Sequence, residues 1–178
     1  AGVMRGISTS ATPDTYSFHR VDATGAPLAL TSTETFDAQY NEDVFRFQNS
    51  TIPDGSYLVI NTRDLAGNEA NTLFIKNTAT GVTVDLARDG LDAFDFTAID
   101  LTRAPDARLS ISEAQLRDLT GPDQTLTIKG ETTDHITLTG VTNVRENVDL
   151  PSGRFDIYTL GNNGATVILE DDVSRTVV

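Results

Sequence analysis

Residues 54–70, DGSYLVINTRDLAGNEA, contain a tight turn, an apolar run and an Asp-x-x-Gly-Asn corner. Pro53-Asp54-Gly55 forms the turn, because proline presets φ at the second turn position and glycine tolerates positive φ. Tyr57 then opens a run rich in β-branched and aromatic residues, which is typical of a strand. The stretch therefore predicts a strand that is bounded by this turn and by the corner at Asp64.

Similar short runs occur on both sides of this stretch. They are rich in Val, Ile, Phe, Tyr and Thr, and Gly, Pro, Asn or Asp closes each of them. In residues 43–48 the alternation places Phe45 and Phe47 on one face and Arg46 on the other. We therefore expect the first half to be an all-β sandwich, with strands at residues 15–21, 43–48, 56–62 and 71–76.

The character of the sequence changes near residues 78–82, where Gly81 and a threonine-rich stretch precede an acidic segment. We place a domain boundary there, between a sandwich at residues 1–80 and a second β-rich module at residues 81–178. One short helix is predicted near residues 113–119. Its limits are indicated by a capping-box pair, Ser112 and Gln115, and by Gly121-Pro122 after its last turn.

The rest of the second module alternates between apolar and polar residues. Residues 125–129 (TLTIK) and 135–139 (HITLT) predict a hairpin around a five-residue loop, and residues 155–160 and 165–171 predict another around GNNG. The predicted fold class is mainly β: a β-sandwich followed by a small β-rich domain with one short helix.

Two stretches resemble known bacterial modules. The run from Asp54 through Tyr57 to the corner at Asp64, Ala66, Gly67 and Asn68 resembles the end of bacterial immunoglobulin-like repeats, and this resemblance covers residues 1–78. Residues 110–140 and 158–173 resemble a module of giant surface adhesins and RTX-type proteins, in which a short helix precedes L-T-I-x-G-x-x-x-D-x-I-x-L. The first resemblance implies that the predicted fold is an immunoglobulin-like β-sandwich followed by the small β-rich domain. Together the two resemblances imply an extracellular protein on a bacterial cell surface, exported by type I secretion.

The resemblance also implies partners and a cofactor. The partners would be neighbouring domains of a longer chain, together with a cell-surface or matrix ligand bound by a distal domain. The cofactor would be calcium, which in such proteins rigidifies the joints between domains. The glycine-aspartate nonapeptide that marks RTX calcium rolls does not occur in this sequence.

Composition narrows the function classes. A formal charge of −13 repels phosphate backbones and anionic lipid heads, so we expect no nucleic-acid partner. No stretch approaches the ~18 consecutive apolar residues of a membrane span, so we expect no membrane insertion by this segment. The absence of cysteine excludes disulfides, thiolate zinc sites and a cysteine nucleophile. We expect an acidic monomer.

The acidic stretch DLARDGLDAFD is the first candidate for a calcium site. Calcium prefers six to eight oxygen ligands, and neighbouring carboxylates repel one another until a cation neutralises them. The spacing only partly imitates an EF-hand loop, so a solvated acidic linker is the alternative. The candidate ligands in this stretch are Asp85, Asp89, Asp92 and Asp95.

The corner at Asp64 and Asn68 is the second candidate. Its alternative is an Asx-type corner, in which these side chains satisfy loop amides and no ion is needed. Asp134 and the acidic residues 170–172 are interpreted as ordinary turn and edge charges, which discourage sheet aggregation.

The sequence predicts that the chain is not an enzyme. His19 and His135 lie on separate predicted strands, and the sequence has neither an H-E-x-x-H nor a G-x-S-x-G motif. The predicted function is that of a structural extender or linker of a surface adhesin, which positions a distal binding domain. The alternative is a module that binds a glycan or a host protein through loops at one end of the sandwich. A glycan array would distinguish the two.

Overall fold

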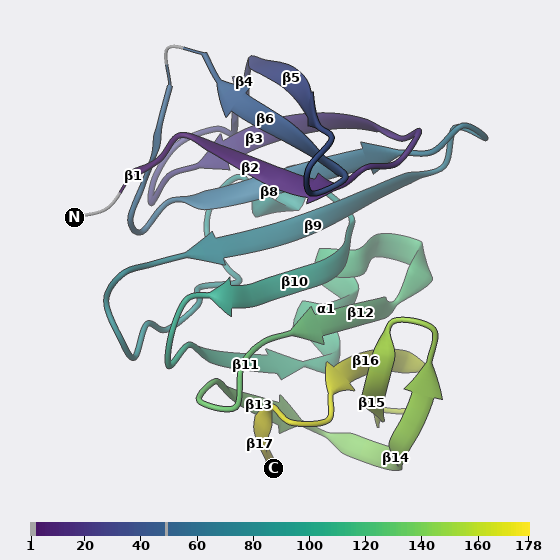
Figure 1. The fold of residues 1–178 in the computed structure, drawn as a ribbon. Helices are drawn as coiled ribbons and strands as arrows, with labels where there is room; N and C mark the ends of the chain where they lie inside the picture. The colour runs from purple at the N-terminus through teal and green to yellow at the C-terminus, as the bar shows by residue number, and fades with distance from the viewer. Residues whose placement is uncertain (1–2, 49) are drawn as a thin grey trace.

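The computed structural model of the chain describes residues 3–48 and 50–178. Within these residues the fold is mainly β, with one α-helix, α1 (Glu113–Thr120), and two 3-10 helices, η1 (Leu91–Ala93) and η2 (Gly121–Asp123). The predicted fold class, mainly β with one short helix, is confirmed at this level. The early strands form the upper end of Figure 1, and the late strands form its lower end.

Two layers of strands pack face to face at the upper end and form what we call the sandwich (Figure 1). Phe18, Phe45 and Leu58 fill the space between the layers and are at most 2% exposed. Arg46 is exposed between the buried Phe45 and Phe47, as the alternation predicts. One layer has the order β2-β6-β5, namely β2 (Gly6–Ser10), β6 (Glu42–Phe47) and β5 (Ser32–Asp37).

The facing layer has the order β9-β8-β3-β4 and also contains the stretch from which the fold was predicted. The predicted turn precedes β8, and Gly55 has a φ of 89° there. A two-stranded ribbon of β1 (Val3–Met4) and β7 (Ile52–Pro53) lies beside the sandwich. The strands of this layer are β3 (Thr15–Val21), β4 (Leu28–Leu30), β8 (Tyr57–Arg63) and β9 (Glu69–Lys76).

The facing layer continues beyond β9. On one side β9 pairs antiparallel with β8, and on the other it pairs parallel with β10 (Phe96–Arg103). The result is one nine-stranded sheet, with the order β14-β15-β16-β12-β10-β9-β8-β3-β4. The predicted boundary at residues 78–82 falls in the connection between β9 and β10, residues 77–95, which we call the junction segment. The division into two folding units stays a prediction.

From β10 onward, six strands wind into a parallel stack. β10, β12 and β16 pair parallel in the large sheet, and β11, β13 and β17 pair parallel in a separate sheet. Each strand of the first set leads through a turn into a strand of the second, which is the connectivity of a short β-solenoid. Beyond β10 the strands are β11 (Arg108–Ser112), β12 (Thr125–Lys129), β13 (His135–Thr139), β16 (Ala165–Glu170) and β17 (Ser174–Val177).

The predicted hairpin of residues 125–129 and 135–139 is wrong. These residues are β12 and β13, which lie in different sheets. Together they form one coil of the stack, and each pairs with strands of the preceding and following coils. Both arrangements bury one face of each strand, so the alternation of Thr with Leu and Ile is the same in each. The second predicted hairpin is confirmed, because β15 (Gly153–Leu160) pairs antiparallel with β16.

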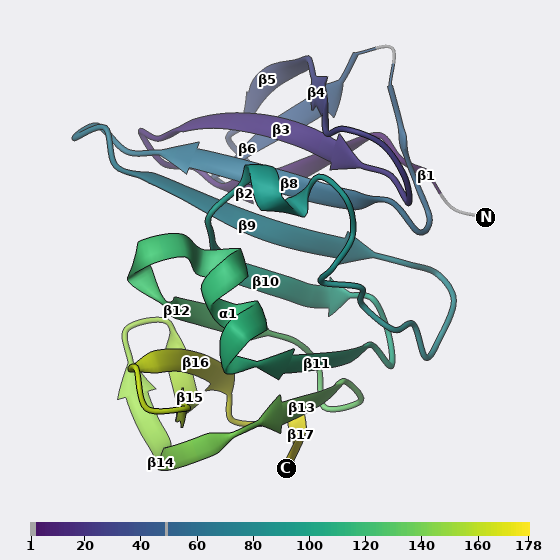
Figure 2. The ribbon, with the colours of Figure 1, turned by 180° about the vertical axis from the view of Figure 1, so that it is seen from behind.

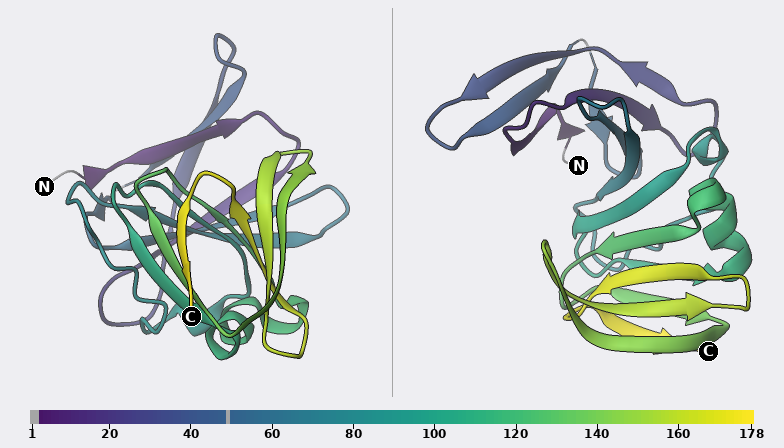
Figure 3. Two further views of the ribbon diagram at one scale, coloured as in Figure 1. Left: turned by 90° about the horizontal axis from the view of Figure 1, so that it is seen from below. Right: turned by 90° about the vertical axis from the view of Figure 1, so that its right-hand side faces the viewer.

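Helix α1 covers one side of the stack, where it contacts β10, β11, β12 and β16 (Figure 2; Figure 3, right). The predicted capping box forms: Ser112 Oγ accepts the N–H of Gln115 at 3.4 Å, and Gln115 Oε1 accepts the N–H of Ser112 at 3.1 Å. Leu116 and Leu119 are buried against the stack. Because an isolated helix of this length is unstable in water, this docking holds it in place.

A hairpin of β14 (Val141–Leu150) and β15 extends the large sheet beyond β16. Asp156 on β15 is only 2% exposed and ties the hairpin to β17, since its Oδ2 lies 2.7 Å from Nη2 of Arg175. Its Oδ1 accepts the N–H of Asn147, which has a φ of 55° at an irregularity of β14. This carboxylate therefore links the hairpin to the parallel stack.

Asp134 is not the ordinary turn charge that the sequence suggested. Its side chain is fully buried, and its two oxygens accept the N–H groups of Ala107 at 2.8 Å and Glu131 at 2.7 Å. Ala107 lies in the turn between β10 and β11, and Glu131 lies in the turn between β12 and β13. One carboxylate thus joins the turns of two successive coils, and a prediction from pattern alone had no means to detect this.

Candidate functional site at the junction segment

The junction segment joins the sandwich to the parallel stack and carries the four predicted calcium ligands. Its backbone continues the solenoid pattern locally: Val84 N–H donates to Arg108 O at 2.8 Å, and Arg108 N–H donates to Val82 O at 2.8 Å. Val84 and Leu91 are buried in the core that the stack shares with β8 and β9. The segment is therefore bound along its length to both of its neighbours.

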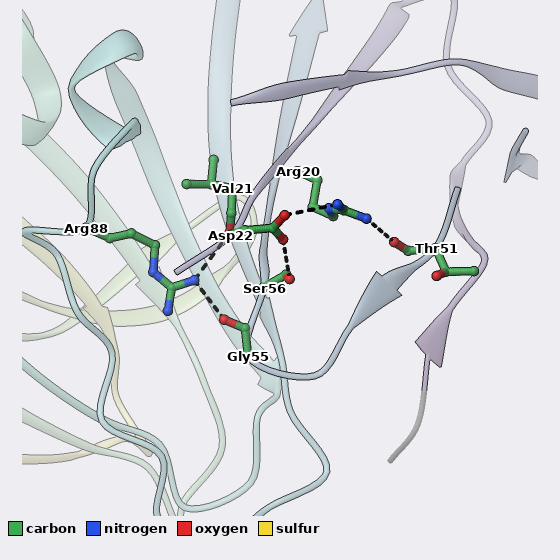
Figure 4. Close-up of polar contacts among 7 residues, drawn as sticks. All are labelled: Arg20, Val21, Asp22, Thr51, Gly55, Ser56 and Arg88. Carbon is green, nitrogen blue, oxygen red and sulfur yellow. Dashed lines mark hydrogen bonds and ion pairs between the residues drawn. The ribbon is translucent and has the colours of Figure 1, made fainter. Parts of the chain in front are cut away.

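Arg88 holds the junction segment against the end of the sandwich (Figure 4). Its Nη1 donates to the carbonyl oxygens of Gly55 at 2.7 Å and Val21 at 3.3 Å. Its guanidinium lies 3.5 Å from the ring centroid of Tyr57, which is within cation–π range. The Tyr57 hydroxyl in turn accepts the N–H of Asp85 at 2.8 Å, and burial raises the pKa of this phenol.

A second polar network braces the same end of the sandwich (Figure 4). Arg20 Nη2 lies 2.9 Å from Asp22 Oδ2, and Arg20 Nη1 donates to Thr51 O at 2.9 Å. Ser56, which is 6% exposed, donates to Asp22 Oδ1 at 2.6 Å. The turn before β8 is thereby fixed to β3, so the carbonyl of Gly55 is held in position for Arg88.

The four aspartates of the junction segment are all exposed. Asp85 Oδ1 accepts the N–H of Ala87 at 3.0 Å, as in an Asx turn. Asp89 and Asp92 line a groove of about 400 Å³ between the junction segment and α1, whereas Asp95 lies against Gly121. Among residues 3–48 and 50–178, no group of three or more Asp, Glu or His side chains is placed to hold a metal ion.

Sequence reasoning missed two residues of this region. Asp118 lines the groove from α1, and no sequence pattern links a helix to an acidic stretch more than twenty residues earlier in the chain. Arg88 could have been noticed, because it is the one cation within the acidic run of residues 85–95. A lone cation among carboxylates indicates that its side chain has a specific contact. The sequence does not indicate that this contact is the ring of Tyr57.

The corner at Asp64 and Asn68 is closed by its own hydrogen bonds. The backbone N–H of Asn68 donates to Asp64 Oδ1 at 2.9 Å, and its side-chain amide donates to Oδ2 at 2.8 Å. The side-chain amide first, and the backbone N–H second, hold the pKa of Asp64 below its ordinary value. Both residues are exposed, and this geometry corresponds to the Asx-type alternative.

The two histidines lie in different parts of the molecule. His19 on β3 packs edge-on against Phe94, with 5.2 Å between ring centroids, and His135 Nε2 lies 2.9 Å from Thr176 Oγ1. The absence of an enzymatic function stays a prediction. No helix among the described residues is long and apolar enough to cross a membrane. Comparison of the chain with protein-family models, curated proteins and solved structures finds no match.

The calcium site stays a prediction, and a melting experiment tests it. If calcium binds the native state through Asp89 and Asp92, a hundredfold excess over Kd raises the free energy of unfolding by about 2.7 kcal/mol. Magnesium should substitute poorly, because it demands a compact octahedron and sheds water reluctantly. The measurement is Tm in chelator, calcium or magnesium, for the wild type, the Asp89→Ala/Asp92→Ala double variant and a matched Asp171→Ala/Asp172→Ala control. An unchanged wild-type Tm at millimolar calcium would identify a solvated acidic linker.

Proposed function

We propose that this chain is a structural extender of a bacterial cell-surface adhesin, a stiff spacer that sets the distance and direction of a distal binding domain. The proposal includes type I secretion, an extracellular location and neighbouring domains as partners. It also includes calcium at the junction segment as a further source of stiffness. The absence of cysteine and the acidic surface are compatible with that setting.

The strand order of the sandwich supports the immunoglobulin-like part of this proposal. In immunoglobulin sandwiches, strands B, E and D lie together in one sheet, and strands C, F and G form the other. The order β2-β6-β5 matches B-E-D, and the order β3-β8-β9 matches C-F-G, with β4 beside β3. The corner at Asp64 then joins F to G, as it does in the repeats that the sequence resembles.

The pairing of β9 with strands on both sides is the observation that carries the extender proposal. A spacer must resist bending, and two domains joined by unpaired residues move relative to each other unless their interface is large and apolar. Here the ladder of β9 and β10 runs from the sandwich into the stack, with irregularities between Phe96 and Ala98 and between Asp100 and Arg103, so the sheet itself connects the two parts. One buried cluster also crosses this connection, since Tyr57 of β8, Leu73 of β9 and Ile99 of β10 all belong to it, whereas the space between the two sandwich layers has a core of its own.

Arg88 adds a second connection that unpaired linkers lack. It bonds two carbonyls of the sandwich from within the junction segment, close to the buried ring of Tyr57. A hydrogen bond from a charged donor contributes about 1.5–3 kcal/mol in a favourable setting, and the cation–π contact about 0.5–2 kcal/mol. Bending at the junction would have to break these contacts together with the sheet ladder.

Distance measurements between spin labels test the stiffness directly. The cysteine-free chain accepts Ser17→Cys on β3 and Thr139→Cys on β13 as unique, exposed labelling sites. We expect double electron–electron resonance to give one narrow distance distribution, which Arg88→Ala broadens while both halves stay folded. Arg117→Ala on the exposed face of α1 is the matched control and should leave the distribution unchanged. A broad or bimodal distribution in the parent protein would contradict a stiff extender.

A further inference from the structure

The edge of the sandwich at β2 is open. Among the residues that the structure describes, β2 pairs with β6 alone and ends the order β2-β6-β5. In Figure 1 β2 lies above β9 and β10, on the side of the sandwich that meets the stack. An open strand edge presents unpaired N–H and C=O groups that another strand can bind.

The hydrogen-bond register identifies the free backbone groups. Phe47 N–H donates to Arg5 O and Ala11 N–H donates to Asn41 O, and both pairs belong to the same ladder as the pair of Ile7 with Phe45. Hydrogen-bonded pairs alternate with non-bonded pairs in an antiparallel ladder, so odd-numbered residues of β2 face β6. The N–H and C=O groups of three residues therefore point to the open edge: Gly6, Ser8 and Ser10. Of these groups, the Ser10 carbonyl also accepts the Thr9 hydroxyl at 3.4 Å.

A groove of about 530 Å³ lies along this open edge. It is bounded by β2 and by residues of β8, β9 and β10, so it separates the free edge from the face of the large sheet. Its apolar surface comes from Met4, Ile7, Ile60 and Phe74, and each of them is only partly buried where it packs against the sandwich core. An extended segment placed there would pair with β2 and cover these side chains.

The charges around the groove are the reverse of those of the whole chain. The lining contains Arg5, Lys76 and Arg103 but only one carboxylate, Asp100, in a chain of net charge −13. Thr102 already donates to Asp100 Oδ1 through its N–H at 3.0 Å and its hydroxyl at 2.6 Å. Lys76 is paired with Asp54 at 3.2 Å, whereas Arg5 and Arg103 form no ion pair within the described residues.

We propose that this groove binds an extended strand of a partner protein, which adds to the sheet at β2 and alternates apolar with acidic residues. Main-chain bonds to Gly6, Ser8 and Ser10 supply the pairing, as in other cases of β-strand addition. Every second side chain covers Ile60 and Phe74, and the intervening carboxylates meet the arginines at the rim. A basic strand fits the backbone equally well but places its charges against Arg5 and Arg103.

Capped synthetic peptides test the proposal on the whole chain. The probe is VEVEVEV, compared with VKVKVKV and with the proline-interrupted VEVPVEV. We expect VEVEVEV to bind with roughly tenfold or higher affinity over VKVKVKV, because like charges at an interface disfavour the wrong partner. Calorimetry measures the affinity of each peptide. Hydrogen exchange of the Gly6, Ser8 and Ser10 amides is the second readout, and bound VEVEVEV should slow it. The interrupted peptide should bind more weakly than either, since it has lost a backbone donor.

Two variants of the protein separate pairing from charge. Ser8→Pro removes one outward N–H and leaves the ladder to β6 intact, so it should abolish binding while Tm changes little. Arg103→Glu should weaken VEVEVEV roughly fivefold to tenfold, and Arg117→Glu, with the same charge change on α1, should not. The proposal is overturned by any of three results: no binding at millimolar peptide, equal binding of VKVKVKV, or a dimer of this chain that Ser8→Pro dissociates.

Discussion

Replacement of Leu73 with alanine is expected to lower the free energy of unfolding by about 3–5 kcal/mol, and to do so in both halves of the chain. Leu73 lies on β9 with no exposed surface, opposite Val59 on β8 and Ile99 on β10. The alanine leaves a cavity beside β9, the strand that joins the sandwich to the stack by pairing with β8 and β10. The buried cluster around Leu73 extends from Val21 in the sandwich to Val173 in the stack, so the loss of stability should affect both the sandwich and the stack.

Native-state hydrogen exchange provides the measurement, with amides of β3 reporting on the sandwich and amides of β13 on the stack. The matched control is Leu58→Ala, which removes an equally buried leucine from the other face of the large sheet, inside the separate core of the sandwich. Leu58→Ala should reduce protection in β3 more than in β13. If Leu73→Ala also leaves β13 protected, the two halves are separate folding units, as the domain boundary near Gly81 predicts.

The parts of the fold that were predictable depend on neighbours in sequence. The helix is an example, since Ser112, Gln115 and Gly121 specify both of its ends within ten residues. The inward and outward faces of β6 are another, because Phe45 and Phe47 flank Arg46 on a strand of period two. Both features follow from local periodicity and capping chemistry.

The parts that were not predictable depend on which strand pairs with which. TLTIK and HITLT alternate apolar with polar residues whether they form a hairpin or successive walls of a solenoid. This two-residue period therefore does not distinguish the parallel stack from a hairpin. The same holds for the candidate site. Asp118 reaches the groove of Asp89 and Asp92 only because α1 docks beside η1, and Asp134 is buried only because two turns stack.

Asp134→Ala is expected to lower the free energy of unfolding by about 2–4 kcal/mol, because it leaves two buried N–H groups without an acceptor. For a chain of this size that is a fall in Tm of about 5–15 °C. Asp134→Asn should be milder, since its side-chain oxygen still accepts one of the two bonds. The control Asp172→Ala removes an exposed carboxylate from the next turn and should change stability by less than about 0.5 kcal/mol.

The pH dependence of these variants separates the charge of Asp134 from its hydrogen bonds. Burial raises the pKa of Asp134 above the ordinary value of 3.8, although both N–H donors act to lower it. Between pH 3.8 and the folded-state pKa, the folded state therefore keeps a proton that the unfolded chain has released. The stabilisation from this group is full below pH 3.8 and is lost as the pH rises through the folded-state pKa. Asp134→Asn has no such titration, so in urea denaturation the wild-type advantage over it should shrink as the pH rises above 3.8 and through the folded-state pKa. An advantage that grows with pH would mean that the two N–H donors outweigh desolvation, and that the turns of the stack are held by a carboxylate that stays ionised.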